Sequence, residues 1–457
     1  MRVAATVDGP LYCCELQRMP QNYSRESLKP RFLRSVGAMA YGQGVTIATQ
    51  LASVPVFLHF WGTVTYGEWL VLSALPVYIG MSDIGLASVA ANDMTIRVAQ
   101  GDNEGALTVY QSAWAGVSIV SLLVLLTAVG VLLGLRLMPG MEAAGLPASQ
   151  VRAVLILLGA ATLLALQGSI VFAAFRATGD NALGIFVGNT ERLVELFATL
   201  AALALGARMV ALAAVLLGVR VLGLIASLMI ARSRAPWLSL GWAHARWHAV
   251  VELLRPGLAF LSFPLSLSLA LQGVVLVVAH FYGAAAVTVF SVYRTLSRLL
   301  VQGVGIFTHS AWPEFSAAFG SRDLTFALSV RRRLGQISVA AAAIGAIGLF
   351  ALGPWFIGVW THHAVPTQLG LLAALIAVAV VNVLWQTDWI LLMAINRHQR
   401  FAVFYLAMTG AGFLLFTAFA KSLPLSIAVL TLLLPEVGLM AVVRRSVAKV
   451  LTGEAWA

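Results

Sequence analysis

Two arginines, Arg294 and Arg298, are the side chains in this sequence best placed to do chemistry. They interrupt a long apolar run at a spacing of i, i+4, which puts both guanidinium groups on one face of a helix. Stacked like charges repel each other, and an ionisable group at membrane depth costs about 2.5–3.5 kcal/mol on insertion scales. A polyanionic ligand such as a diphosphate would relieve both costs through charge-assisted hydrogen bonds. The alternative is that Asp83, or another acid on a facing helix, pairs them.

Three further polar side chains lie close enough in the sequence pattern to share a cavity with this pair. Tyr293 and Gln302 belong to the same apolar run, and Gln272 belongs to the preceding one. They are candidate cavity-lining residues, and they could equally make interhelical hydrogen bonds.

Acidic residues inside apolar runs suggest two other roles. Asp83, Glu436 and Asp388 could each bind a coupling proton or Na⁺, and the sequence does not choose among them. Glu195 and Arg220 lie at matching depths on consecutive predicted helices. A structural ion pair between them is therefore the favoured interpretation.

Patterns typical of enzymes are missing from the sequence. His244 and His248 have metal-pair spacing, but no Glu follows His244 directly and no third ligand is evident. Cys13 and Cys14 are adjacent in a polar tail, unlike the separated pairs of a zinc site. No Gly-rich nucleotide loop of the Walker type occurs. We therefore expect no metal site, no cofactor beyond a coupling H⁺ or Na⁺, and no enzymatic activity.

The elements that must position these residues follow from composition. Of 457 residues, 60% are hydrophobic and 10% are charged, with a mean hydropathy of +0.91, whereas soluble chains carry roughly a quarter charged residues. A membrane span needs about 20 apolar residues. The pattern predicts an all-α, polytopic membrane protein with about twelve transmembrane helices, at 36–60, 67–91, 109–134, 151–175, 182–205, 209–230, 256–281, 286–309, 336–360, 368–394, 401–420 and 425–443.

The basic residues indicate the orientation of these spans. With a cytoplasmic N-terminus, 21 Lys and Arg residues lie in inside segments and four in outside segments, which fits the positive-inside rule. Both termini are then cytoplasmic. The net charge of +11 is explained by contact with anionic lipid headgroups rather than with nucleic acid.

A weak internal repeat divides the spans into two halves. His59–Gly62 and His280–Gly283 share the pattern HFxG at an offset of 221, each at the end of a predicted span. Six spans per half give two parallel six-helix bundles around a central cavity, which is a transporter architecture. The predicted order is a cytoplasmic N-terminal tail (1–35), a first six-helix bundle (36–230), a cytoplasmic interfacial linker rich in Trp and Arg (231–255), a second six-helix bundle (256–443) and a cytoplasmic C-terminal tail (444–457).

The stretch Tyr66–Leu107 adds a family resemblance. Its matching elements are Tyr66-Gly67 with Trp69, the run Ser82-Asp83-Ile84-Gly85-Leu86, and an inside turn with Asn92, Arg97, Gly101 and Asp102. In these elements the sequence resembles the oligosaccharide flippases of bacterial polysaccharide biosynthesis. Those flippases belong to the multidrug/oligosaccharidyl-lipid/polysaccharide exporter superfamily. Residues 1–30 are longer than a usual tail of that family, and Met19 is an alternative start.

The resemblance implies an alternating-access flippase in the bacterial inner membrane, used in surface polysaccharide (exopolysaccharide) biosynthesis. Its substrate would be a polyprenyl-diphosphate-linked oligosaccharide moved from the cytoplasmic to the periplasmic leaflet. Its partners would be the lipid-linked glycan, membrane lipid, and the polysaccharide polymerase and export machinery. The alternative is a cation-coupled multidrug or small-molecule exporter of the same superfamily.

Overall fold

The structure, a computed structural model, describes residues 25–80, 85–134, 147–252, 262–310, 315, 324–394 and 399–451. Every regular element in these residues is helical, as the sequence predicts. The elements are α2 (Arg25–Gly80), α3 (Leu86–Ala99), α4 (Asn103–Gly134), α6 (Ala148–Ala177), α7 (Asn181–Ala204), α8 (Met209–Arg234), α10 (Ser262–Ser268), the π-helix η3 (Leu269–Gly273), α11 (Val274–Tyr282), α12 (Ala284–Ser310), α14 (Leu324–Trp360), α15 (Leu369–Ala394), α16 (Gln399–Ala420), α17 (Leu425–Ala428), the 3₁₀-helix η4 (Val429–Leu432) and α18 (Leu433–Leu451).

The described residues contain ten helices that are long and apolar enough to cross a membrane, where the sequence predicted about twelve spans. The first two predicted spans join in one helix, α2. The fifth, α7, carries the charged residues Glu191, Arg192 and Glu195, so it is too polar to count among the ten. Within the part of the chain that the structure describes, helical residues nevertheless lie in each of the twelve predicted ranges.

The second predicted span, 67–91, is corrected by the structure. Its helix ends at Gly80, and a new helix, α3, begins at Leu86 after Gly85, which has φ 71°. A left-handed φ costs little only for glycine. Pro76 lies inside α2 and does not end it.

The repeated HFxG motif takes the same conformation in both halves. Gly62 and Gly283 have φ of 72° and 84° with extended ψ, so each breaks its helix at the same place in the motif. The ring planes of His59 and Phe60 meet at 83°, and so do those of His280 and Phe281. The matching geometry supports an internal repeat.

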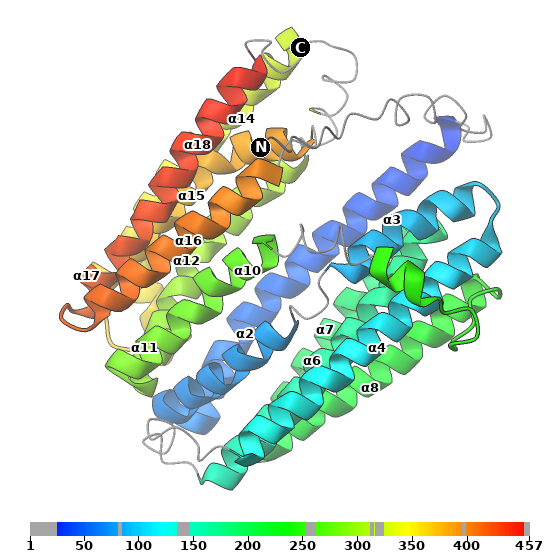
Figure 1. Ribbon diagram of the computed structural model, residues 1–457. Helices are drawn as coiled ribbons and strands as arrows, with labels where there is room; N and C mark the ends of the chain where they lie inside the picture. The colour runs from blue at the N-terminus through cyan, green and yellow to red at the C-terminus, as the bar shows by residue number, and fades with distance from the viewer. Residues whose placement is uncertain are drawn as a thin grey trace, which may run out of the picture.

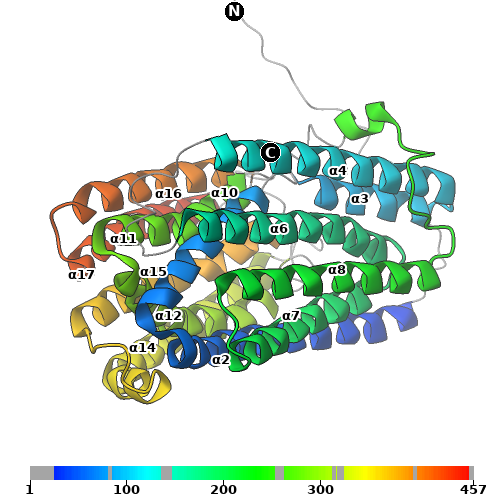
Figure 2. The same ribbon diagram turned by 90° about the horizontal axis from the view of Figure 1, so that it is seen from below.

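Two groups of helices lie side by side, with α2 between them (Figure 1, Figure 2). One group contains α3, α4, α6, α7 and α8, and the other contains α10–α12 and α14–α18. Helix α2 packs on α6 and α7 of the first group and on α12 of the second. Its long, kinked course lets one element belong to the first bundle and still form most of the boundary with the second.

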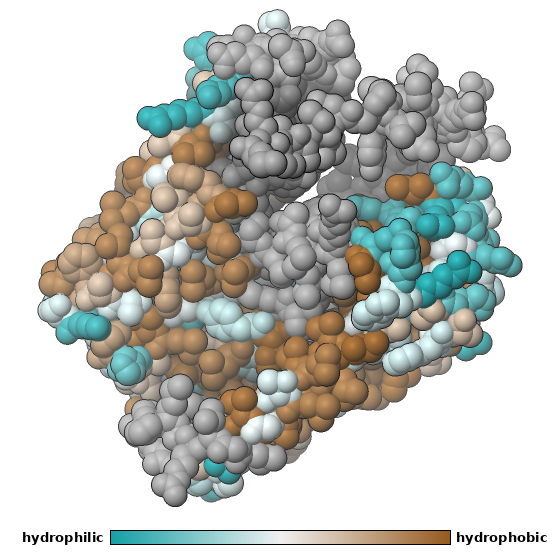
Figure 3. All heavy atoms as spheres, in the orientation of Figure 1, coloured by the Kyte–Doolittle hydropathy of each residue, from teal (hydrophilic) through white to brown (hydrophobic). Residues whose placement is uncertain are grey.

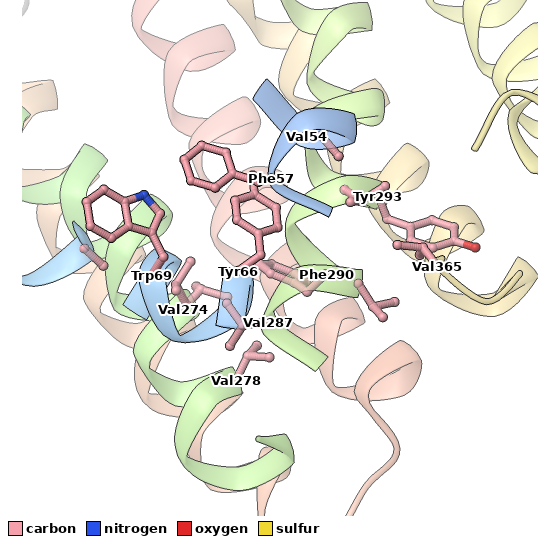
Figure 4. Close-up of a cluster of buried hydrophobic side chains, with 14 of the residues drawn as sticks. Val54, Phe57, Tyr66, Trp69, Val274, Val278, Val287, Phe290, Tyr293 and Val365 are labelled. Carbon is pink, nitrogen blue, oxygen red and sulfur yellow. The ribbon is translucent and has the colours of Figure 1, made fainter. Parts of the chain in front are cut away.

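A buried apolar cluster fills this boundary at the end of the molecule that contains Gly62. Phe57 and Tyr66 of α2 stack at 4.9 Å between ring centroids, and Val287 and Phe290 of α12 lie in the same cluster (Figure 4). Thr288 donates a hydrogen bond of 2.7 Å to the carbonyl of Thr63. The two halves are thus joined tightly at this end, which the charge pattern predicts to be the outer one.

The exterior of the molecule is apolar along the helices. Many large hydrophobic side chains are exposed, including Leu222, Met229, Ile344 and Ile347, each about two-thirds or more exposed. Brown, hydrophobic residues cover much of the face in Figure 3, and teal, hydrophilic ones gather toward the ends of α3 and α4. An apolar belt with polar ends is what a lipid bilayer requires, so the helices indicate a membrane protein.

The segment that follows α8 is docked on the first bundle. The buried amide of Gln111 donates to the Ser239 carbonyl at 3.0 Å and accepts from the His244 N–H at 2.8 Å. Trp242 and Trp247 are exposed. This arrangement agrees with a segment lying at the membrane interface, where Trp is enriched.

Replacing Gly67 by valine should open the boundary. A Cβ at Gly67 would overlap the Ala284 carbonyl of the other half, so the helices must separate. We expect the melting temperature to fall by about 4 °C and a cysteine at buried Thr288 to become reactive to a polar maleimide. Gly44→Val is the control, because open space surrounds Gly44 on the same helix. Equal effects of the two variants would refute this account.

Candidate functional site

The two arginines of α12 line a cavity inside the second bundle. This cavity, of about 250 Å³, is bounded by α10, η3, α12, α15, α16 and α18, and we call it the small cavity. Arg294 and Arg298 share it with Ser297, Asn382 and Glu436. The structure therefore brings the predicted arginine pair into one chamber with an otherwise largely apolar lining, but within a single bundle rather than between the two.

Neither arginine has a carboxylate partner among the described residues, where no acidic oxygen lies within 4.0 Å of either guanidinium. Nη1 of Arg294 instead donates to the backbone carbonyl of Leu271 at 2.5 Å, and its guanidinium carbon lies 5.0 Å from the ring centroid of Phe290. Asp83, the alternative partner, lies outside the described residues. Two positive charges thus face the small cavity with no anion in contact.

Glu436 supplies the acid of the small cavity. One of its carboxylate oxygens accepts hydrogen bonds from Asn382 at 3.1 Å and from the indole N–H of Trp385 at 2.8 Å. These two donors hold the carboxylate in the wall. Of the predicted candidates for ion coupling, Glu436 lies in the same chamber as the arginines.

The other predicted lining residues lie elsewhere. Tyr293 is buried, donates to the Pro366 carbonyl and accepts from the Gln368 N–H, so it fastens the loop between α14 and α15. It directly precedes Arg294, and successive helical side chains diverge by about 100°. Gln302 donates to Gln50 of α2 at 3.2 Å and links the two halves. Gln272 is half-buried in η3 and does not line the small cavity.

A larger cavity, of about 1090 Å³, lies against the first bundle and reaches Ser268 of α10. This cavity was not predicted from the sequence. The aromatic rings of Phe57 and Trp69 border it, and hydroxyl and amide groups face it from several helices, among them Thr46, Thr49, Gln50, Ser53, Ser73 and Thr162. Four of these residues follow the i, i+3, i+4, i+7 spacing of one helix face, a signal that could have revealed the cavity.

The predicted Glu195–Arg220 ion pair is confirmed and is part of a triad. Arg220 lies 2.7 Å from Glu195 and 2.8 Å from Glu191. Arg192, on the same helix as both acids, lines the large cavity. With two acids and two bases, this cluster is balanced in charge.

Asp388 has a structural partner. Its carboxylate oxygens lie 2.6 Å and 3.2 Å from the Arg331 guanidinium, and its side chain is buried. This bidentate pair removes the need for a coupling ion at Asp388. No group of three or more metal-ligating side chains occurs among the described residues; His248, of the metal-like spacing, lies 3.3 Å from Glu252 instead.

Comparison with known proteins places the fold. No family model and no curated protein sequence matches the chain. Among solved structures, it is similar to the inward-facing conformation of a multidrug resistance MATE family transporter of the MOP superfamily, with a TM-score of 0.69, 15% identity, and coverage of 89% of this chain and 98% of that chain.

A MATE structure in complex with MaL6 gives a TM-score of 0.66 at 15% identity, covering 93% of this chain and 97% of that one. The chain has the fold of these transporters. A MOP superfamily transporter from Pyrococcus furiosus, for which a reverse polarity of the binding pocket suggests a different function, gives 0.63 at 16% identity, covering 93% and 96%. The structural neighbours are transporters rather than enzymes.

Removing Arg220 should destabilise the first bundle. Arg220→Ala leaves Glu191 and Glu195 without their cation, and we expect a loss of about 2 kcal/mol, below the roughly 3–5 kcal/mol of fully buried pairs because the triad is partly exposed. Adding Glu191→Gln and Glu195→Gln should restore most of it. Thermal unfolding of the purified protein measures both changes. Arg192→Ala is the matched control, and a loss as large as that of Arg220→Ala would argue against the triad.

Proposed function

We propose that this protein is an alternating-access transporter that flips a polyprenyl-diphosphate-linked oligosaccharide across the membrane for surface polysaccharide biosynthesis. The observation that carries the proposal is the pair Arg294 and Arg298, which faces a cavity with no carboxylate in contact among the described residues. Guanidinium groups bind phosphate oxygens through paired, charge-assisted hydrogen bonds. An anionic headgroup would supply a counter-charge in direct contact with the guanidinium groups, which Glu436, held by Asn382 and Trp385, does not.

The sizes of the two cavities suggest that each holds a different part of the ligand. The small cavity, at about 250 Å³, lies below the 300–1,000 Å³ or so of typical ligand sites and suits a compact diphosphate. The large cavity, at about 1090 Å³, has room for a glycan. Its hydroxyl and amide groups can hydrogen-bond sugar hydroxyls, and its aromatic rings offer apolar faces.

The conformation fits the loading step of such a cycle. The similarity is greater to the inward-facing MATE transporter, with a TM-score of 0.69, than to an outward-facing one, with 0.63. The halves are also joined at the Gly62 end, where Thr288 bonds to Thr63. A cavity closed on that side would take its substrate from the cytoplasmic leaflet, if both termini are cytoplasmic as the charge pattern predicts.

Coupling would use Glu436. It shares the small cavity with the two arginines, and as an acid at membrane depth it could bind a coupling proton or Na⁺. The location that goes with this function is the bacterial inner membrane. The accompanying partners are the polymerase and export machinery that consume the flipped glycan.

The alternative, a cation-coupled multidrug exporter, has support from the fold of the neighbouring structures. A cavity for cationic drugs would be expected to present free acids. The acids of the described chambers are engaged instead: Glu195 contacts Arg220, and Glu436 accepts two hydrogen bonds. The charge balance therefore favours an anionic substrate.

The double variant Arg294→Gln/Arg298→Gln should abolish flipping. In vesicles loaded with a labelled polyprenyl-diphosphate sugar, we expect the rate to drop at least about 100-fold, because two charge-assisted contacts are lost. The double lysine variant keeps both charges without the bidentate geometry, so its rate should lie between those of the glutamine variant and the wild type. A wild-type flipping rate in the glutamine variant would contradict the proposal. If the wild type exports a cationic dye and the glutamine variant exports it equally fast, the exporter alternative is favoured.

A further inference from the structure

One helical segment contributes residues to the linings of both cavities. Ser268, at the end of α10, lines the large cavity, whereas Leu267, Ala270 and Leu271 line the small one. The segment α10–η3–α11 packs on α2 of the first half and on α16 of the second, and Figure 1 shows α10 between these two helices. We call residues 267–274 the wall.

The wall contains a defect in its backbone. Residues Leu269–Gly273 form a π-helix, a rare form that is frequent at functional sites. An extra residue in a helical turn disturbs the regular i→i−4 bonding. Two carbonyls of the wall also accept hydrogen bonds from side chains of other helices. Arg294 donates to the Leu271 carbonyl at 2.5 Å, and Tyr78 donates to the Ser268 carbonyl at 3.4 Å.

These two donors come from the two halves of the molecule. Tyr78 belongs to α2 of the first half, and Arg294 belongs to α12 of the second. Close packing at Gly273 lets the Tyr78 hydroxyl approach, since a Cβ there would lie 3.2 Å from that oxygen and 2.9 Å from the Phe413 ring. Of the pair that faces the small cavity, Arg294 is the member that bonds to the backbone of the wall among the described residues.

We propose that Arg294 is a ligand-released latch on this wall. Without ligand, its guanidinium satisfies the Leu271 carbonyl and keeps the π-helical segment in place. A diphosphate entering the small cavity competes for the same guanidinium, because an anion is a stronger acceptor than a neutral carbonyl. The released carbonyl then leaves the π-helical segment free to rearrange, and the two cavities can join around one ligand. This inference rests on the proposed function, in which the small cavity takes the diphosphate.

The arrangement would link binding to motion. The wall touches both halves, so a change in its backbone alters the contacts on which their relative position depends. Only a ligand with an anionic group that can reach Arg294 would release it. A neutral sugar in the large cavity would leave the latch closed.

Hydrogen exchange of the peptides covering 269–275 in the purified protein tests the latch, with inorganic diphosphate as the probe. We expect diphosphate to raise the melting temperature and to speed exchange of this segment about tenfold, the effect of losing one hydrogen bond to a charged group. Arg294→Gln should show the faster exchange without diphosphate and no further response. Arg298→Gln is the matched control, with wild-type exchange before addition and a weakened response after it.

The outcomes separate the latch from the proposed function. If diphosphate raises the melting temperature but leaves exchange unchanged or slower, the latch is wrong and the anion site stands. If diphosphate has no effect on the melting temperature, the anion site fails and the latch fails with it. Wild-type exchange in Arg294→Gln also overturns the latch. Tyr78→Phe controls for general loosening of the segment. It should raise exchange without diphosphate and still respond to diphosphate, because Arg294 is intact.

Discussion

A guanidinium group at membrane depth needs an anion, water or a set of acceptors, and the second bundle is organised by that need. Arg294 and Arg298 stand on one face of α12, so their charges are close and alike. The bundle meets part of the cost with a carbonyl from Leu271 and the ring of Phe290. It leaves the rest to a cavity. The guanidinium charges that no carboxylate of the bundle contacts are available to an anionic ligand.

The contrast with other arginines in the helices makes the point sharper. Arg220 lies against two carboxylates, and Arg331 holds Asp388 in a bidentate pair. Each of these sites is closed by partners from the chain itself, so neither needs a ligand to complete it. The pair on α12 is different because its carboxylate, Glu436, is held by two other donors instead. Arginines paired with carboxylates of the chain therefore have a structural role, whereas the two arginines without such a contact are the candidates for binding a ligand.

Much of this arrangement could be predicted from the sequence, and the exceptions have physical reasons. The Glu195–Arg220 pair was predictable because a short turn joins α7 and α8, so equal depth implies contact. The broken second span was missed because the apolar pattern continues past Gly85. Tyr293 was misplaced because proximity in sequence to Arg294 is not proximity on a helix face. The position of the arginines inside one bundle depends on how the surrounding helices pack. A local sequence pattern does not contain that information.

The separation of the cavities explains how one site could be both selective and mobile. A single chamber large enough for a glycan would be wet, and its arginines would be screened and weakly selective. A small chamber keeps their field strong but cannot hold sugars. A π-helical wall that lines both reconciles these demands, because its backbone is already irregular and needs less rearrangement than a regular helix. In this view the defect around Leu271 is where the charge of the headgroup and the bulk of the glycan meet.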